Sequence, residues 1–498
     1  METFPINYTK KAVKGLGIVT VLMALTSLLA YILRVILARK LSPTDFGLFY
    51  AVLAFMMFLL IFRDFGLRVG LVKFIAHYAV ERNYSKIKTL IAASLVFQLL
   101  SSAILIIFFI VFSSYLAKHY FKDPRASILL ILFGLYVFFS LLCNVVYSIL
   151  QGFQEVKWYA SEELIRLGVT IIAFFIFYAV GYGILSAAIA FVIGVASAFV
   201  ILTLKVIHYS DIWKAKIYDF KGATKELFAF SAPVIFTGMG NKVIAWLDVL
   251  MLTYFVSLEM VGIYNVVLPT ALLFLFFAKA SSKILLPMVS ELWSKNDYKR
   301  LFAGVQLLYR YMFIITLPLI ISIFVFAPLF IETLFGQEYL GGIVAFRIVL
   351  VGVLGYVIAA NNHAIITAVG KPTLVMKIVL FAAVANIVLN ILLIPSLGIV
   401  GAAIATAISY ICMLLLSTNY VSKFVAMESP WKVWLRVTLS GMIFTAVLFF
   451  IPLKILTGWP GAILSVCIGG ILYCVTLYYQ KLLNLTEIKQ LLALVLQK

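Results

Sequence analysis

Charged and amide side chains within long apolar stretches are the residues of this sequence best suited to chemistry. Arg34, Lys242 and Arg347 lie inside such stretches, and Asn241 directly precedes Lys242. An ionisable group in hydrocarbon is energetically expensive, so it usually faces a cavity or a partner. We therefore expect these four residues to line a polar cavity that can hold an anionic group. Snorkelling to a membrane interface is the alternative for Arg34 and Arg347, because each lies within roughly two turns of a helix end.

A second group of basic residues lies at the ends of two apolar stretches. Arg63, Asp64 and Arg68 close one stretch, and Lys279 and Lys283 close another. These side chains either attract anionic headgroups to a cytoplasmic mouth or anchor the helix ends at the membrane surface. Other polar residues inside apolar stretches, Asn361, Asn362, His363, Asn386 and Asn390, are expected to form hydrogen bonds between helices.

The elements that position these residues follow from composition. Hydrophobic residues make up 65% of the 498 residues and charged residues only 12%, with a mean hydropathy of +1.15. Such a chain has too little polar surface to cover a soluble globule. The four cysteines lie in apolar runs without the spacing of disulfides or metal sites, and no cofactor motif is present. No signal peptide is predicted, because the first apolar stretch is too long and Arg39 and Lys40 follow it.

Fourteen membrane-spanning helices are predicted, since a bilayer core needs about 20 apolar residues per helix. They are expected near residues 15–38, 46–62, 90–116, 127–150, 163–180, 184–207, 227–255, 261–285, 307–330, 344–369, 374–394, 399–421, 433–453 and 462–479. Kinks or local unwinding are expected at Pro233 with Gly238 and Gly240, at Pro269 and at Pro318. Residues 481–498 form an amphipathic pattern that predicts a cytoplasmic tail lying on the membrane surface.

The distribution of basic residues predicts the orientation. Lysine and arginine collect in the segments near residues 10–14, 63–88, 214–225 and 295–300, whereas the alternate loops are poorer in them. The positive-inside rule then places both termini in the cytoplasm of a plasma-membrane protein. This bias accounts for most of the net charge of +20, so nucleic-acid binding is not expected.

An internal repeat predicts two lobes. Residues 183–193 recur at 398–408 with an offset of 215, and Gly47 matches Gly262 at the same offset. We expect six-helix lobes at 1–208 and 209–425, related as parallel repeats by a pseudo-twofold axis, followed by two extra helices at 426–480. Arg34 and Asp248 are equivalent at an offset of 214. Across such an axis their opposite charges predict a gate on the outer side, although each could instead meet headgroups independently.

Several motifs resemble the oligosaccharide flippases of the multidrug, oligosaccharidyl-lipid and polysaccharide exporter superfamily. They are RVILARKLSPTDFGLF at 34–49, DFGL at 64–67, QGFQ at 151–154 with Tyr159 and Ala160, VGIY at 261–264 and GIVGAA at 398–403. The resemblance covers essentially the whole chain. It implies two bundles around a central cavity and movement of a polyprenyl-linked sugar from the inner to the outer leaflet. Turn and packing signatures dominate these motifs, so they support the fold more than the substrate.

Two function classes remain after these observations. A flippase for lipid-linked oligosaccharides is favoured, with membrane lipids as partners, a coupling ion left open and a monomer as the functional unit. A multidrug antiporter of the same superfamily is the alternative. Those carriers tend to have an acidic residue in the first helix, where this chain has Arg34. A glycosyltransferase is not expected, because no outer loop is long enough to form a catalytic domain.

Overall fold

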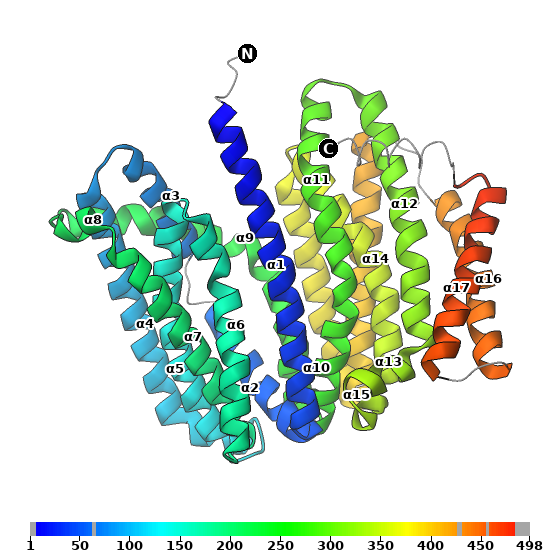
Figure 1. The fold of residues 1–498 in the computed structure, drawn as a ribbon, viewed down its shortest axis with the longest axis horizontal. Coiled ribbons are helices and arrows are strands. Elements are labelled where there is room, and N and C mark those ends of the chain that lie inside the picture. The colour runs from blue at the N-terminus through cyan, green and yellow to red at the C-terminus, as the bar shows by residue number, and fades with distance from the viewer. Residues whose placement is uncertain (1–5, 62–65, 426–430, 455–457, 484–498) are drawn as a thin grey trace. The chain divides into compact units, whose positions relative to one another are not determined.

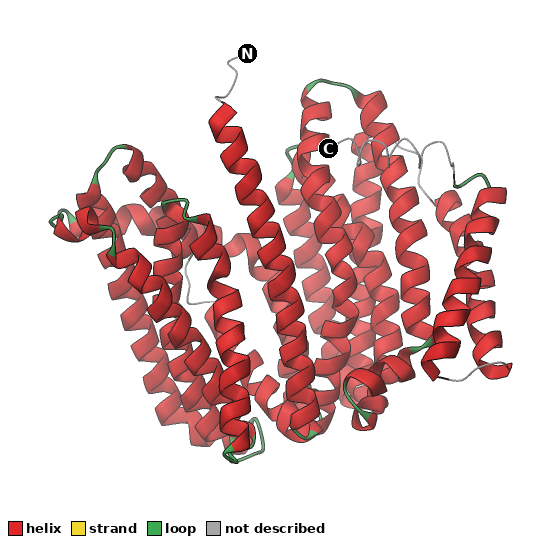
Figure 2. Ribbon diagram, in the orientation of Figure 1, coloured by secondary structure: helices red, strands yellow, loops and turns green. Residues whose placement is uncertain are grey.

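The computed structural model describes residues 6–61, 66–425, 431–454 and 458–483, and every regular element in these ranges is a helix (Figures 1 and 2). A helix satisfies its backbone N–H and C=O groups within one segment, which hydrocarbon requires. Eleven segments of these ranges are long and apolar enough to cross a membrane. The predicted class, an all-α polytopic membrane protein, is therefore confirmed.

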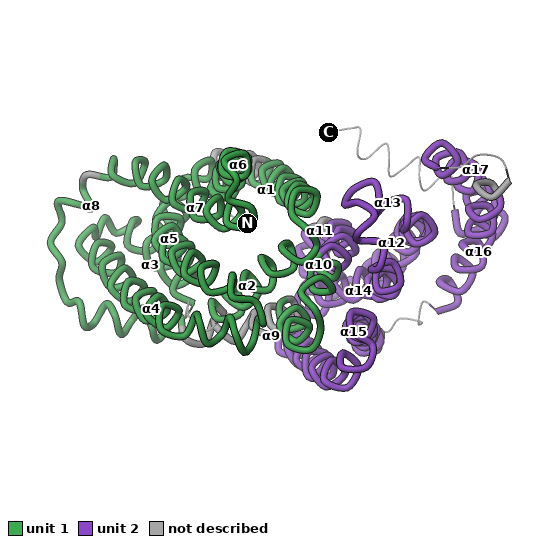
Figure 3. Tube along the Cα trace, turned by 90° about the horizontal axis from the view of Figure 1, so that it is seen from below, with its two compact units in different colours: residues 1–265 green, residues 266–498 purple. Residues whose placement is uncertain are grey.

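The chain divides into two compact units, residues 1–265 and 266–498 (Figure 3). The first unit contains α1 (Ile6–Lys40), α2 (Pro43–Ile61), α3 (Leu67–Val80), α4 (Tyr84–His119), α5 (Ala126–Gly152), α6 (Val156–Ala179), α7 (Ile184–Ile207), α8 (Ser210–Lys214), α9 (Phe220–Phe255) and the start of α10 (Leu258–Ala271). The second contains η1 (Leu272–Phe274), α11 (Leu275–Ser294), α12 (Tyr298–Val325), α13 (Ala327–Leu334), η2 (Gln337–Gly342), α14 (Ile343–Ala368), α15 (Pro372–Val425), α16 (Trp431–Lys454) and α17 (Gly458–Tyr479).

Most predicted spans coincide with one helix or part of one, but the span expected at 261–285 is divided among α10, η1 and α11, and the one at 307–330 between α12 and α13. The eleven apolar segments include α15, which covers two predicted spans and is interrupted at Gly398, where φ is 56°. Helices α6 and α9 match the two remaining predicted spans and are not among the eleven segments. Helix α6 carries Glu162, Glu163 and Arg166, and in α9 the side chains of residues 232–245 lie outside the described residues, which leaves the shorter apolar segment Trp246–Phe255. The number of helices that cross the membrane stays a prediction, as do the lobe boundaries. The first compact unit extends beyond residue 208 because α9 packs on α2, α3 and α4.

Two helices of the first unit are absent from the sequence-based expectation. Helix α3 begins after Gly66, whose φ of 67° is left-handed, and α8 lies in the connection between α7 and α9. Both are too short to cross a bilayer. Helix α3 buries one face against α4, α5 and α9, through Leu67, Leu71, Phe74, Ile75 and Tyr78. Helix α3 is therefore stabilised by packing against its neighbours, and not by an apolar stretch long enough to cross a bilayer.

The expected helix breaks have different outcomes. Helix α10 gives way to the short 3₁₀ segment η1 three residues after Pro269, which confirms a break there. The unwinding expected around Pro233 and Gly238 is not observed, because α9 is helical throughout. Pro318 also leaves α12 intact. It cannot donate to the carbonyl of Ile314, and the hydroxyl of Tyr473 donates to that carbonyl instead, at 3.0 Å.

The glycines that match across the repeat lie against each other. A Cβ atom on Gly47 in α2 would be 1.8 Å from the carbonyl oxygen of Leu258, and one on Gly262 in α10 would be 2.1 Å from that of Pro43. The contact is reciprocal, because Pro43 and Leu258 are also 215 residues apart. A twofold relation between α2 and α10 would produce this reciprocity.

Candidate functional site

The first unit encloses a polar cavity of about 570 Å³ between α1, α2, α3, α5, α6 and α7. Its volume is that of a small-molecule site. Hydroxyl and amide groups line it, from Thr26, Ser27, Ser140 and Asn144, together with the phenols of Tyr136, Tyr147 and Tyr159. Charged side chains enter from α3 and α6. A polar cavity among apolar helices is where a hydrophilic ligand can be accommodated.

Helix α6 supplies three charged side chains to this cavity. Arg166 is paired with Glu162 at 3.5 Å, one turn earlier on the helix, and with Glu163 at 3.1 Å. The thiol of Cys143 on α5 also donates to Glu162, at 3.8 Å. A buried guanidinium is tolerated when carboxylates neutralise it and accept its N–H groups. Arg166 therefore has its charge compensated within the protein.

Close packing of α7 on α6 fixes this cluster. A Cβ atom on Gly194 of α7 would lie 2.0 Å from the hydroxyl of Thr170 and 2.7 Å from the carbonyl oxygen of Arg166. That hydroxyl itself donates to the same carbonyl at 2.7 Å. Only glycine allows the two backbones to approach so closely. Gly194 therefore determines how closely α7 approaches the part of α6 that carries Arg166.

Arg68 enters the cavity from α3. The left-handed Gly66 turns the chain into α3, so Arg68 falls in its first turn. Its guanidinium carbon lies 3.9 Å from the ring centroid of Tyr147, whose ring meets that of Tyr159 edge-on at 5.6 Å. Among the residues that the structure describes, no carboxylate forms an ion pair with Arg68. A stacked guanidinium keeps its in-plane N–H groups available for an anion.

The two residues predicted to form a gate both bind α10. Arg34 on α1 donates from Nη1 to the carbonyl oxygen of Asn265 at 2.5 Å, and its guanidinium lies 4.3 Å from the Tyr50 ring centroid. Asp248 on α9 is fully buried and accepts a hydrogen bond from the hydroxyl of Tyr264 at 3.0 Å. Two consecutive residues of α10, Tyr264 and Asn265, therefore bind Asp248 and Arg34, respectively.

The structure places the other predicted residues in several elements. Arg63 and Asp64 lie outside the described residues, and Asn241 and Lys242 lie in α9 with side chains that are also outside them. Arg68 does not close the second span, because it begins the separate helix α3. Lys279 and Lys283 are exposed on α11 but do not close it either, because the helix continues to Ser294. Arg347 lies in the first turns of α14, where its Nε donates to the carbonyl oxygen of Phe324 at 3.0 Å.

The second unit holds a buried hydrogen-bond network that the sequence predicted in part. The Nδ2 group of Asn362 on α14 donates to Ser417 at 2.9 Å and to Thr418 at 3.0 Å on α15, and its Oδ1 accepts from Tyr309 on α12. Asn361 accepts from Ser281 on α11 at 2.6 Å. The expectation of hydrogen bonds between helices is confirmed for these two asparagines. Asn386 and Asn390 are bonded to each other along α15, at 3.1 Å.

A groove of a different character lies in the second unit. It has a volume of about 490 Å³ and lies between α12, α14, α15 and α16. Nearly all of its lining is apolar, including Phe313, Leu354, Ile411, Trp431 and Trp434. The two units therefore contain a charged cavity and an apolar groove, respectively. In the described part of the chain, no group of three or more His, Cys, Asp or Glu side chains could hold a metal ion.

Comparison with known proteins identifies the family. Residues 12–293, more than half of the chain, match the family described as polysaccharide biosynthesis protein. The chain belongs to this family. An uncharacterized membrane protein of Methanocaldococcus jannaschii is 29% identical over an alignment that covers 99% of this chain and 100% of that protein. A probable low-salt glycan biosynthesis flippase of Haloferax volcanii is 26% identical over 92% of this chain and 94% of its own length.

A solved structure shares the fold of this chain. The chain resembles the lipid II flippase MurJ in an inward closed conformation with a TM-score of 0.73, 18% sequence identity and coverage of 94% of this chain and 99% of that one. At this identity the likeness shows the fold alone. The resemblance to the oligosaccharide flippase family predicted from the motifs is thus confirmed.

The sequence-based prediction of the site missed its α6 cluster. Glu162 directly precedes the span expected at 163–180, and Glu163 and Arg166 lie in its first turn, whereas the observed α6 begins at Val156 and includes all three. Their spacing carries a signal, because side chains three and four residues apart share one helix face. Tyr147 could not be found this way, since its role depends on the stacking of Arg68 from another helix.

Proposed function

We propose that the chain is a flippase that moves a lipid-linked oligosaccharide from the cytoplasmic to the outer leaflet by alternating access. The observation that carries this proposal is the cavity of the first unit, where Arg68 is stacked on Tyr147 and has no ion pair among the residues that the structure describes. A sugar headgroup with phosphates cannot cross hydrocarbon without a polar path. Membership of the polysaccharide biosynthesis family and the similarity to a probable glycan flippase support the substrate class.

The cavity and the groove, each taken by itself, match the two unlike parts of such a substrate. The cavity of the first unit offers an arginine for a phosphate or another acidic group, and tyrosine rings for the apolar faces of sugars. The groove of the second unit offers aliphatic and indole side chains for a hydrocarbon chain. A lipid-linked sugar has both kinds of surface. A purely hydrophobic drug would offer no counter-charge to Arg68, which has no ion pair among the described residues.

A transport assay with purified protein tests the proposal. The chain would be reconstituted in liposomes with a fluorescent lipid-linked oligosaccharide, and the fraction accessible to an impermeant quencher would be followed with time. Arg68→Gln should slow flipping by about tenfold or more, because one charged hydrogen bond contributes about 1.5–3 kcal/mol. Arg68→Lys should retain part of the rate. Arg82→Gln, which alters an exposed arginine outside the cavity, is the matched control.

Two outcomes would contradict the proposal. Flipping at the wild-type rate by Arg68→Gln would remove Arg68 from the site. Failure of the wild-type protein to flip any lipid-linked oligosaccharide, combined with dye export driven by a cation gradient, would instead support the multidrug antiporter.

The residues predicted from the sequence keep a place in this proposal. We assign Arg34, Asn241, Lys242 and Arg347 to the substrate path, and Arg63, Asp64, Arg68, Lys279 and Lys283 to its cytoplasmic mouth. The functional unit is a monomer in the plasma membrane. The charges attract the anionic headgroup, since the field of clustered basic residues extends over about a Debye length.

The gate proposal concerns Arg34 and Asp248 and leads to a charge-swap experiment. Both side chains bind consecutive residues of α10, so a movement of α10 would act on both. Arg34→Asp and Asp248→Arg should each impair transport, and the double variant should recover part of the rate. A double variant no better than the worse single variant would assign Arg34 to headgroup binding alone.

A further inference from the structure

The connection between α7 and α9 is fixed to the start of α4 through its backbone. Lys88 donates from Nζ to the carbonyl oxygens of Trp213 and Ala215, at 2.7 and 2.8 Å. The hydroxyl of Ser85 donates to the carbonyl oxygen of Lys216 at 2.5 Å. The connection is too irregular to pair these carbonyl groups within its own backbone. Side chains of α4 donate hydrogen bonds to them instead. The ammonium group of Lys88 therefore has its hydrogen-bond partners within the protein.

The anchoring continues to the first turn of α9. Thr89 accepts a hydrogen bond from the backbone N–H of Tyr218 at 3.1 Å and donates to its carbonyl at 3.2 Å. Asp219 adopts a left-handed conformation, with φ of 49°, and its side chain caps α9 by accepting from the N–H of Gly222 at 3.0 Å. Aspartate tolerates this conformation better than most residues and is a preferred N-cap. The carbonyls of residues 213, 215, 216 and 218 are therefore bonded to α4, and most side chains of the segment are exposed, whereas Ile212 and Ala223 are buried.

The outward side chains alternate between apolar and cationic types. Exposed fractions are 74% for Tyr218, 52% for Ile217 and 39–40% for Trp213 and Phe220. The lysines interleaved with them, Lys214, Lys216, Lys221 and Lys225, are all exposed. Two aspartates lie in the same segment: Asp219 caps α9 and Asp211 is exposed, so the four lysines outnumber the acidic side chains. The surface formed by residues 211–225, termed here the connecting surface, is therefore both basic and aromatic.

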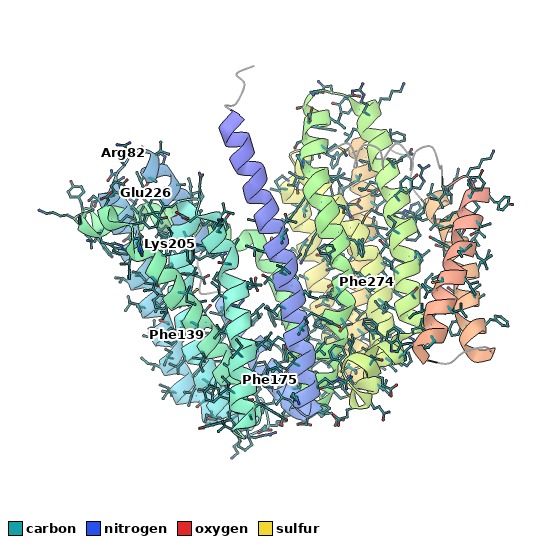
Figure 4. All side chains as sticks on the ribbon, in the orientation of Figure 1. Arg82, Phe139, Phe175, Lys205, Glu226 and Phe274 are labelled. Carbon is teal, nitrogen blue, oxygen red and sulfur yellow. The ribbon has the colours of Figure 1, made fainter. Side chains whose placement is uncertain are left out.

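The connecting surface lies at the level where spanning helices end. Helix α7 ends at Ile207 and α4 begins at Tyr84, and residues 85–89 of α4 bind the connection directly. Figure 4 shows Arg82, Lys205 and Glu226 at this same end of the first unit, and Phe175 toward the other end. Tryptophan and tyrosine concentrate at the level of lipid headgroups in membrane proteins.

A hydrogen-bonded triad holds the beginning of α9 at this level. Tyr78 on α3 donates to Glu226 at 2.8 Å and accepts from Lys86 at 2.9 Å, and Lys86 is also paired with Glu226 at 3.7 Å. Burial raises the pKa of the Tyr78 phenol above its ordinary value. The ammonium groups of Lys86 and Lys88 thus bind partners within the protein, whereas the four lysines of the connecting surface face outward.

We propose that the connecting surface binds the anionic lipid headgroups of the leaflet at this end of the first unit. Lysines there would contact lipid phosphates, and Trp213, Ile217, Tyr218 and Phe220 would enter the interface between headgroups and acyl chains. The occupant is argued from charge complementarity and from the position of the surface at the helix ends. A bilayer interface offers phosphates and acyl chains side by side, which matches lysines interleaved with apolar side chains and makes lipid a better match than a soluble acidic protein.

The test measures lipid binding without transport. The four native cysteines would be replaced and an environment-sensitive fluorophore attached at Ile217→Cys in the full-length, detergent-solubilised chain. Titration with short-chain phosphatidylglycerol should shift the emission saturably, whereas short-chain phosphatidylcholine should not. Added salt should weaken the response, because it screens exposed charges.

Charge variants define which side chains bind. Replacing Lys214, Lys216, Lys221 and Lys225 with glutamine should weaken phosphatidylglycerol binding by about fivefold per lysine, and by at least about a hundredfold together. Replacing the same four with arginine keeps the charge and should preserve binding. Equal binding by the glutamine variant, or no response of the wild-type protein to phosphatidylglycerol, overturns the proposal and leaves an acidic protein as the partner to be sought.

This inference is separable from the proposed function. A chain that binds phosphatidylglycerol at the connecting surface but flips no lipid-linked oligosaccharide would retain the lipid site and lose the flippase proposal. A chain that flips its substrate equally well with or without bound phosphatidylglycerol would retain both, because the binding titration does not depend on flipping.

Discussion

Arg68 and Arg166 line one cavity but have different electrostatic surroundings. Arg166 is held by two carboxylates on its own helix, whereas Arg68 is stacked on Tyr147 without an ion pair in the described residues. A compensated arginine stabilises the helix packing, and an uncompensated one is available to a ligand. This division separates the structural from the binding residues of the cavity.

The α6 cluster allows a stability prediction at the residue scale. Arg166→Met should lower the free energy of unfolding by about 3 kcal/mol, because it leaves Glu162 as a poorly solvated charge without its partner. Adding Glu162→Gln should restore part of the loss, since a neutral amide needs no counter-charge. Thermal unfolding of the purified variants measures both effects.

A second ion pair, between Arg300 and Asp297, provides a control for the Arg166 experiment. Arg300→Met, which removes an exposed ion pair with Asp297, should change the free energy of unfolding by less than about 1 kcal/mol. A double variant of Arg166 and Glu162 that is less stable than Arg166→Met alone would show that the carboxylate has another essential partner.

At the scale of elements, the contact between α2 and α10 depends on two glycines. Gly47→Ala should destabilise the protein by about 1–3 kcal/mol, because the new methyl group would overlap the Leu258 carbonyl and force the helices apart. Gly262→Ala should have a similar effect through Pro43. The double variant should cost less than the sum, since the first substitution already separates the helices.

Gly168→Ala is the matched control for these glycines. Gly168 lies within α6, and a Cβ atom there would have no neighbour within 4 Å. Alanine should leave the stability unchanged or raise it by up to about 1 kcal/mol, because glycine is a poor helix former. Equal effects at positions 47 and 168 would contradict the close approach of α2 and α10.

These elements show what the sequence can predict and what it cannot. Helix α7 was predicted at its observed bounds, Ile184–Ile207, because an apolar run between a glycine turn and basic residues has one interpretation in a bilayer. Helix α3 was not predicted, since its short apolar face has meaning only against α5 and α9. The stacking of Arg68 on Tyr147 was missed for the same reason. Pairings between distant segments depend on tertiary packing, which periodicity alone does not contain.

At the scale of the whole molecule, charge asymmetry predicts the orientation in the membrane. Basic residues accumulate at the end of the first unit where α3 meets α4, near Arg82, and in the connection around Ile217. Ser257 belongs to the opposite end of that unit, because Lys122, just after α4, donates to the nearby carbonyl of Tyr254 at 3.1 Å. In the second unit, Asn296 and Gln337 lie before and after the spanning helix α12. If both termini are cytoplasmic, the basic ends face the cytoplasm.

Single-cysteine labelling of intact cells tests this orientation. Positions 82, 217, 257, 296 and 337 are exposed in the structure, so an impermeant maleimide should label all five cysteine variants equally in detergent. In intact cells, the variants at Ser257 and Gln337 should react, and those at Arg82, Ile217 and Asn296 should react only after permeabilisation. Ser85 is a poorer position, because it is half-buried and its hydroxyl is bonded to the Lys216 carbonyl. The reverse pattern would place both termini outside, and the connecting surface would then face the outer leaflet.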